Sequence, residues 1–194
     1  QYIDLYRECR QQICDHSADA LNAVRDAAFA DFERMGFPSR KVERYKYTTI
    51  DSLFEPNYGV NINRIEVPVD PYKAFKCDVP TLSTSLYFIV NDQFRSALQP
   101  KENLPEGVVV TSLAEYAKEN PEFVAKHYAQ LAKTNEDAIT ALNTMLAQDG
   151  LLVYVKKNVI VDKTVQVINI LRSNVALMVN RRVLIVMEEG ASAK

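Results

Sequence analysis

The sequence contains few of the side chains from which catalytic and metal sites are built. Its only two histidines are His16 and His127, in segments expected to form separate helices. A histidine-based metal site or a catalytic triad therefore has little to draw on. Both histidines are better explained as surface or helix-capping residues. We predict no catalytic, cofactor-binding or metal-ligating residue in this chain.

Cysteine is equally scarce, because Cys9, Cys14 and Cys77 make an odd number with no C-x-x-C spacing. Cys9 and Cys14 would lie about 140° apart around a regular helix, so the two side chains could not coordinate the same metal ion. We expect all three to be small buried hydrophobic residues. No disulfide framework is expected, and a reducing cytoplasm is the simplest location.

Glycine, long apolar runs and excess charge are also missing. The five glycines do not form a phosphate-binding loop, and no apolar run approaches the roughly 20 residues of a membrane span. A net charge of −2 creates no field that would attract nucleic acid or an anionic membrane. The chain starts at Gln1 without an apolar segment, so no signal peptide is visible. We expect a cytoplasmic protein without a membrane partner.

Residues 1–150 are predicted to form a mainly helical domain with a small β element. Ile3, Tyr6 and Ile13 fit one face of a first helix. A second helix is predicted with Ser17 as its N-cap and Gly36 at its end. Its apolar stripe consists of Leu21, Val24, Ala28, Phe32 and Met35. The two helices should form a hairpin.

The middle of this region alternates between loops and short elements. We expect a short helix near 49–54, a strand at 86–90 that turns through Asn91-Asp92 into a return strand at 93–95, and another strand at 107–110. Further helices should begin at Ser112, which has capping-box spacing to Glu115, at Asn120-Pro121, and at Thr134. The last of these is expected to end at Asp149-Gly150.

Beyond Gly150 the composition changes from helix formers to valine and isoleucine, and we place a domain boundary there. Five apolar runs follow in residues 151–194, separated by two or three polar residues: 151–155, 159–161, 165–171, 175–179 and 183–187. This spacing fits either a β-sandwich or a solenoid. No glycine is present to make tight hairpins between Leu151 and Glu189, which favours the solenoid.

A basic and aromatic segment at residues 40–47 permits a second interpretation. Its Arg40, Lys41, Arg44 and Lys46 alternate with Tyr45 and Tyr47, a composition that can clasp single-stranded nucleic acid. Glu43 interrupts the cluster and the net charge of the chain is negative. A solvated segment with its tyrosines packed on the body is therefore favoured over a nucleic-acid site.

The same segment carries a family resemblance. Residues 36–48, GFPSRKVERYKYT, resemble the G-x-P-x-x-K-x-E-x-W-K-Y-T signature of the SufD family, which assembles iron–sulfur clusters, with Tyr45 in place of the usual tryptophan. Residues 180–191, NRRVLIVMEEGA, are similar to the R-x-L-I-V-x-E-x-x-A stretch that opens the family's β-helix. The two motifs occur in the expected order. SufB, a related family, shares the β-helix and a looser form of the first motif.

The resemblance implies an α+β chain: a helical N-terminal domain, then the first coils of a right-handed parallel β-helix at 151–194. It also implies a non-catalytic scaffold subunit that works with SufB and the ATPase SufC. No cofactor is expected in residues 1–194, because the family's functional Cys and His positions would lie beyond Lys194; the full complex would handle the iron–sulfur cluster.

Two further expectations follow. An open β-helix edge exposes unpaired backbone groups, so we predict that a second copy covers it, as a dimer or a strand-swapped assembly. The alternative function is a β-helix enzyme acting on polysaccharide, which would need acidic pairs along one face. Asp162 is the only acid between Leu151 and Glu188, which makes this alternative weaker.

Overall fold

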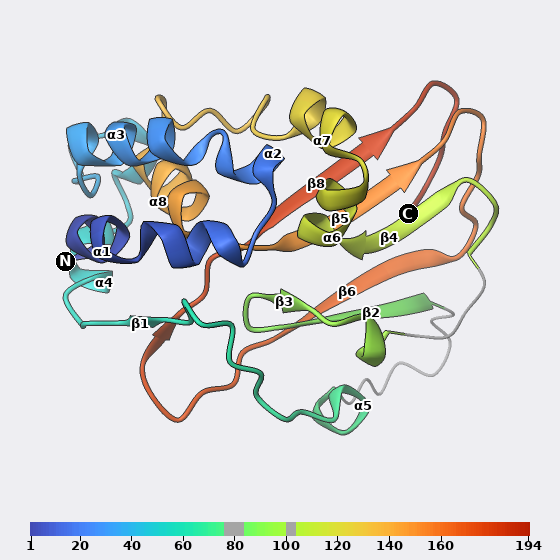
Figure 1. Ribbon diagram of the computed structural model, residues 1–194, viewed down its shortest axis with the longest axis horizontal. Coiled ribbons are helices and arrows are strands. Elements are labelled where there is room, and N and C mark those ends of the chain that lie inside the picture. Colours follow the sequence, from blue (N-terminus) through green and yellow to red (C-terminus); the bar gives the residue numbers. More distant parts are fainter. Residues whose placement is uncertain (76–83, 100–103) are drawn as a thin grey trace.

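The computed structural model describes residues 1–75, 84–99 and 104–194 as an α+β fold (Figure 1), which confirms the predicted class. Four helices, α1, α3, α4 and α8, gather at the end of the molecule that holds the N-terminus, whereas β2, β4, β5, β6 and β8 fill the other end, with α6 and α7 beside them. The helices are α1 Tyr2–Asp15, α2 Asp19–Asn22, α3 Arg25–Met35, η1 Glu43–Tyr45, α4 Ile50–Leu53, α5 Pro71–Ala74, η2 Ser96–Leu98, α6 Leu113–Glu119, α7 Pro121–His127 and α8 Ala138–Leu146. The strands are β1 Gly59–Val60, β2 Thr84–Val90, β3 Gln93–Phe94, β4 Val108–Ser112, β5 Gly150–Val155, β6 Thr164–Ile170, β7 Leu177–Met178 and β8 Arg182–Met187.

The strands form three small sheets, ordered β3-β2-β6, β4-β5-β8 and β1-β7. Within the C-terminal segment the pairing is parallel with a constant spacing. Leu151 pairs with Val183 and Ile160 bridges to Ser192, a separation of 32 residues in both places. The chain thus makes one full circuit through β5, β6 and β7 before β8 lies beside β5.

The strand predictions for this segment are largely confirmed. The runs at 151–155, 165–171 and 183–187 became β5, β6 and β8. The run at 175–179 gave only the two-residue β7, and the run at 159–161 contributes a single bridge at Ile160. The hairpin of β2 and β3 turns at Asn91-Asp92 as predicted, with Asn91 at a positive φ of 52°.

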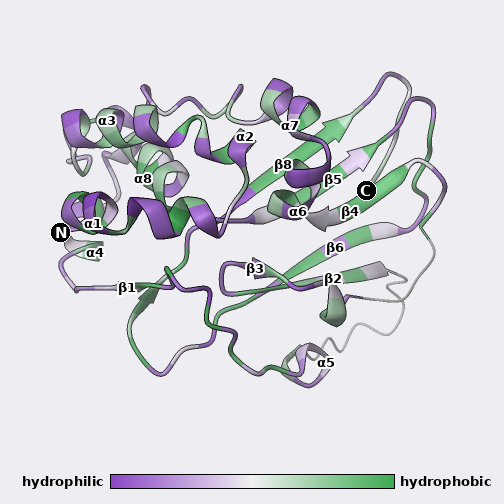
Figure 2. Ribbon diagram, viewed as in Figure 1, coloured by the Kyte–Doolittle hydropathy of each residue, from purple (hydrophilic) through white to green (hydrophobic). Residues whose placement is uncertain are grey.

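Alternating side chains of β8 point to two different sides of the strand. Leu184 and Val186 pack toward a core that includes Leu113 of α6 and Val124 of α7. Val183 and Ile185 face the opposite side and line a hollow with Val165 of β6. Figure 2 shows the hydrophobic colouring of β5, β6 and β8, as expected for strands with apolar groups on both faces.

The second predicted helix is broken into α2 and α3, which corrects the expectation of one continuous stripe. The stripe serves two cores: Leu21 packs with α6 and α7, whereas Ala28 and Phe32 pack with α1 and α8. A straight helix could not turn the same stripe toward both, and the α-helix is interrupted at Ala23 and Val24, two turn residues between α2 and α3 that keep right-handed backbone angles. The predicted helical hairpin forms between α1 and α3, where Tyr6 stacks on Phe29 at 4.9 Å.

Two predicted helix starts were also wrong. Ala18 occupies the N-cap position of α2, while the hydroxyl of Ser17 accepts a hydrogen bond from Arg25 instead. The last helix begins at Ala138 rather than near Thr134, because the Asp137 carboxylate accepts a hydrogen bond from the Ile139 N–H and caps it there. Ser112 caps α6 as predicted, by accepting from the Glu115 N–H.

The domain boundary at Gly150 remains a prediction. Strands on its two sides share sheets: β4 pairs with β5, and β2 pairs with β6.

Candidate functional site

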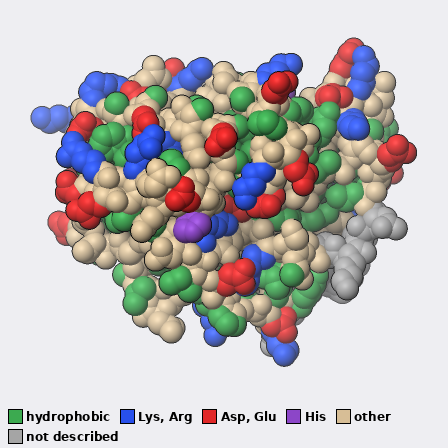
Figure 3. Space-filling view, in the orientation of Figure 1, with side chains coloured by type: hydrophobic (Ala, Val, Ile, Leu, Met, Phe, Trp, Pro, Cys, Tyr) green, Lys and Arg blue, Asp and Glu red, His purple; other side chains and the backbone are tan. Residues whose placement is uncertain are grey.

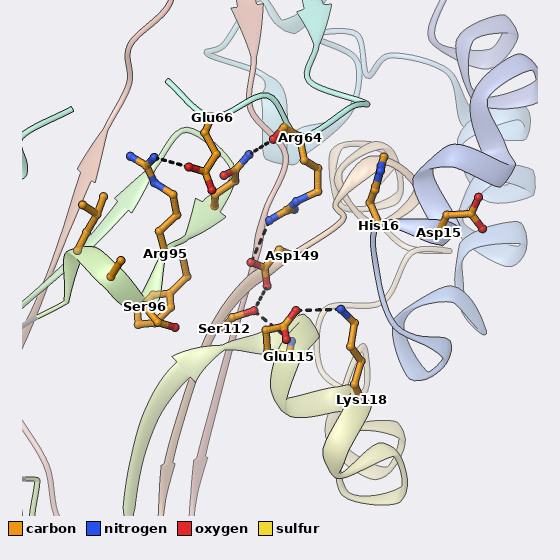
Figure 4. Close-up of a pocket in the computed structure, with 14 residues that line it drawn as sticks. Asp15, His16, Arg64, Glu66, Arg95, Ser96, Ser112, Glu115, Lys118 and Asp149 are labelled. Atoms are coloured by element: carbon orange, nitrogen blue, oxygen red, sulfur yellow. Dashed lines mark hydrogen bonds and ion pairs between the residues drawn. The ribbon is translucent and has the colours of Figure 1, made fainter. Parts of the chain in front are cut away.

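A polar hollow of about 550 Å³ lies where the helical end of the molecule meets the sheets (Figure 4). Figure 3 shows charged side chains of both signs, with a histidine among them, in the middle of this face. The C-terminal end of α1, the segment after β1, the β3–η2 segment and the first turns of α6 form its walls. The charged and hydroxyl-bearing lining residues are Asp15, His16, Arg64, Glu66, Arg95, Ser96, Ser112, Glu115, Lys118 and Asp149.

Asp149 is the centre of the site. Its side chain is only 3% exposed, and it accepts hydrogen bonds from Ser112 Oγ at 2.8 Å and from the Ala114 N–H at 3.0 Å. Arg64 Nη2 lies 3.3 Å from its other oxygen. Three donors therefore satisfy a buried carboxylate that would otherwise be costly. Because Asp149 directly precedes β5, it fixes that strand to α6 and to the segment after β1.

A second buried acid, Asp92, lies near Arg64 in the β2–β3 turn. Burial raises the pKa of the Asp92 carboxyl, and the charge of Arg64 opposes part of that rise. Burial also lowers the pKa of the Arg181 guanidinium, which Asp92 partly offsets. Arg181 Nη1 donates to the Asn91 carbonyl at 3.1 Å, so the same turn is held from the β8 side.

Two further ion pairs line the hollow. Arg95 binds Glu66 at 3.2 Å, and Lys118 binds Glu115 at 2.8 Å. In the described part of the chain, no group of three or more histidine, cysteine or acidic side chains could hold a metal ion. This arrangement of opposed pairs is suited to joining segments of the fold rather than to activating a nucleophile.

The histidines and cysteines do not converge on one site. His16 is exposed at the C-cap of α1, with Nδ1 2.9 Å from the Ile62 carbonyl oxygen, whereas His127 ends α7 against Phe123. Cys9 and Cys14 are free and half-buried, so they are more exposed than predicted. Cys77 lies outside the described residues.

Comparison with known proteins decides the family. Residues 1–167 match the family model described as the SufBD protein N-terminal region. The chain belongs to the SufBD family. An iron–sulfur cluster assembly protein SufD of Bacillus subtilis (strain 168) is 32% identical over 133 residues, which cover 68% of this chain and 30% of that protein.

Other members of the SufBD family match more distantly. An iron–sulfur cluster assembly SufBD family protein of Arabidopsis thaliana is 25% identical over 122 residues, 62% of this chain and 25% of the relative. A protein of the same description from Synechocystis sp. (strain ATCC 27184 / PCC 6803 / Kazusa) is 23% identical over 142 residues, 73% of this chain and 22% of the relative. The chain thus spans less than a third of the length of the curated relatives that it matches.

The signature segment of the family has a clear structural role in this chain. The Tyr45 hydroxyl donates to Asp137 Oδ1 at 2.6 Å, and Arg44 pairs with Asp137 Oδ2 at 3.2 Å. Burial and this hydrogen bond raise the pKa of Tyr45 to about 12. Burial alone would raise the pKa of Asp137, but hydrogen bonds from Tyr45, Thr140 and the Ile139 N–H outweigh it and lower the pKa. The segment therefore secures the N-terminus of α8.

The remaining residues of segment 40–47 are mostly turned to solvent. Arg40 donates to Thr49, and Lys46 lies 3.7 Å from Glu43. Tyr47 is 91% exposed. Packing of the tyrosines on the body is thus confirmed for Tyr45 and wrong for Tyr47.

Sequence reasoning missed Arg64, Asp92 and Asp149. Asp149-Gly150 was interpreted only as the end of a helix, and Asp92 only as a turn residue. No local pattern marks a buried acid, because its burial depends on segments far away in the chain.

Of the helices in the described ranges, none is long and apolar enough to cross a lipid bilayer.

Proposed function

We propose that this chain is the N-terminal part of a SufD-like scaffold subunit of an iron–sulfur cluster assembly complex, with SufB and the ATPase SufC as its partners. The match of residues 1–167 to the SufBD N-terminal region carries this proposal. The B. subtilis relative named SufD supports it. Catalysis in such a complex would belong to the ATPase partner, and the cluster would be handled by the assembled complex.

The constant 32-residue pairing supports the architectural part of the proposal. Parallel neighbours at fixed separation are the pattern of a solenoid coil stacked on the next. Right-handed crossovers dominate such connections. We infer that β5, β6 and β7 form the first coil of a right-handed parallel β-helix and that β8 opens the second.

The charged side chains of the polar hollow and of segment 40–47 support a structural rather than a catalytic role, because they bind other parts of the fold. The buried Asp149 carboxylate links α6 and the start of β5 to the segment after β1, through hydrogen bonds and its ion pair with Arg64, and Arg44 is paired with Asp137. Neither alternative function gains support from the described residues. A carbohydrate-active site would rest on Asp162 alone, and a nucleic-acid site on residues 40–47 would have to compete with these internal pairs. Free Cys9 and Cys14 agree with a reducing cytoplasm.

Co-purification tests the proposal. The full-length gene product that contains this chain would be tagged and co-expressed with SufB and SufC from the same organism. We expect all three proteins to elute together and to remain together through gel filtration. An unrelated protein with the same tag serves as the control. Elution of the tagged protein without SufB and SufC would contradict the assignment.

A further inference from the structure

The segment formed by β5, β6 and β7 is covered strand by strand along one edge. β4 pairs with β5 on the edge opposite to β8, β2 pairs with β6 along the whole of both strands, and β1 pairs with β7. Figure 1 shows β4 along β5 and β2 along β6. We call the covered edge of β5, β6 and β7 the start edge, because β8 carries the chain onward along the other edge of β5. Every strand on the start edge therefore has a neighbour from the N-terminal region.

The covering strands are not a coil of the same kind. The chain passes through β5, β6 and β7 in that order, whereas the covering strands come along the chain as β1 on β7, β2 on β6 and β4 on β5. β4 is also antiparallel to β5, while β8 is parallel to it. A preceding coil would repeat the order and the direction of the next one. The stack of coils therefore starts at β5, and a different structure lies against its first edge.

The side-chain amide of Asn91 extends this cover beyond the paired strands. It donates to the Arg172 carbonyl at 2.9 Å and accepts from the Arg172 N–H at 2.9 Å. A carboxamide presents one donor and one acceptor side by side, as the backbone of a neighbouring strand does. Asn91 thus continues the ladder between β2 and β6 past Ile170, the last residue of β6.

A second amide closes the far side of β2. The Gln99 side chain accepts from the Phe88 N–H at 2.8 Å and donates to the Phe88 carbonyl at 2.8 Å. The next two residues of β2, Ile89 and Val90, pair with β3. The strand that covers β6 is therefore itself covered at these three residues.

We propose that β1, β2 with Gln99, and β4 act together as a cap that closes the start edge to any further β-strand, whether from a second copy or from another protein. This role rests on the coil architecture proposed above and adds a protective function for the N-terminal region. An open row of backbone N–H and C=O groups pairs readily with other chains and causes aggregation. Repeat proteins accordingly need terminal units that differ from their internal repeats.

Hydrogen exchange in the full-length gene product that contains this chain tests the cap in the natural sequence. Lys156 and Arg172 are exposed, yet the Lys156 N–H donates to the Gly107 carbonyl at 2.9 Å and the Arg172 N–H to Asn91. We expect both amides to exchange at least about tenfold more slowly than in an unstructured peptide of the same sequence. Unprotected exchange at both positions would overturn the proposal. The measurement needs neither SufB nor SufC, so its failure is distinct from a failure of the scaffold assignment.

Asn91→Gly tests the first amide. Glycine accommodates the positive φ of 52° at this position, so the change removes only the side chain. We expect exchange at Arg172 to become at least about tenfold faster while Lys156, which lies under the segment before β4, stays protected. An unchanged rate at Arg172 would show that Asn91 does not extend the cap.

Gln99→Leu tests whether the cap prevents association. Leucine cannot bond the Phe88 backbone, so the far side of β2 opens. We expect this variant of the full-length product to aggregate faster, by light scattering, than Tyr45→Phe, which loses the hydrogen bond to Asp137 away from the coil. Gln12→Leu makes the same change at an exposed position of α1 and should behave as the natural protein. Aggregation of Gln99→Leu no faster than that of Tyr45→Phe would overturn the protective role.

Discussion

Arg25 shows how single buried side chains organise the helical end. Its guanidinium is fully buried and donates to Ser17 Oγ at 2.8 Å, to Asn22 Oδ1 at 2.8 Å and to the Met145 carbonyl at 3.1 Å. Burial lowers the pKa of Arg25, since a desolvated charge is disfavoured. The hydrogen bonds from Arg25 to the carbonyls in the last turn of α8 compensate in part for the cost of burying its charge. They also fix α8 against α2 and α3. Tyr45 plays the matching role at the other end of α8.

Tyr45→Phe is the first prediction. The change removes the hydrogen bond to Asp137, so we expect a loss of about 1 to 2 kcal/mol in the free energy of unfolding at pH 7. Asp137 has a lowered pKa in the folded state; its stabilising effect is therefore present above the ordinary aspartate pKa of about 4 and disappears as pH falls through the folded value. The difference between Tyr45→Phe and the natural chain should shrink below about pH 4.

Chemical denaturation across pH would measure this effect. Tyr47→Phe is the matched control, because its 91% exposed ring should leave stability almost unchanged. Equal losses for the two variants would show that the Tyr45–Asp137 contact contributes nothing specific.

At the scale of elements, the turns that follow β5 and β8 fix the register between these two strands. The corner after β5 carries Lys157, and the corner after β8 carries Glu188 and Glu189. Glu188 accepts from the Tyr154 hydroxyl at 2.6 Å and from the Lys157 N–H at 2.8 Å, while Lys157 Nζ pairs with Glu189 at 2.7 Å. Basic and acidic corners thus lie on top of each other, which disfavours a slipped pairing of β8 on β5.

Close approach of the same two strands gives the second prediction. A Cβ added at Gly150 would lie 1.8 Å from the Arg182 carbonyl oxygen, so Gly150→Ala must push β8 away from β5. We expect a loss of about 2 to 3 kcal/mol in the free energy of unfolding. Gly59→Ala is the control, because its Cβ would lie 3.6 Å from the nearest atom, the Ala176 carbonyl oxygen. Thermal unfolding of the two variants measures the difference, and a tolerated Gly150→Ala would contradict this packing.

In the whole molecule, the cores extend across the predicted boundary at Gly150. One core joins Leu113 and Val124 of the helices to Leu152 and Tyr154 of β5. Another combines Tyr87 of β2 with strands from both sides of the boundary. Neither region buries its apolar surface alone, which makes folding of the two regions interdependent.

Truncation provides the third prediction. A fragment of residues 1–150 loses β6, the parallel partner of β2, and β5, the partner of β4, and it uncovers the apolar face of α6 and α7. We therefore expect it to show no cooperative thermal transition, in contrast to the 194-residue chain. Circular dichroism melting of both would decide. A cooperative transition in the fragment would instead support an autonomous domain ending at Gly150.

Local sequence was sufficient to predict the elements with local causes. The apolar runs of β5, β6 and β8, the β2–β3 turn at Asn91-Asp92 and the end of α3 at Gly36 were all predictable, because strand alternation, turn chemistry and glycine's access to positive φ operate over a few residues. Tertiary structure alone decided the break between α2 and α3 and the burial of Asp92 and Asp149. Each of these depends on segments distant in the chain: two cores that compete for one helical stripe, and an arginine 85 residues from Asp149.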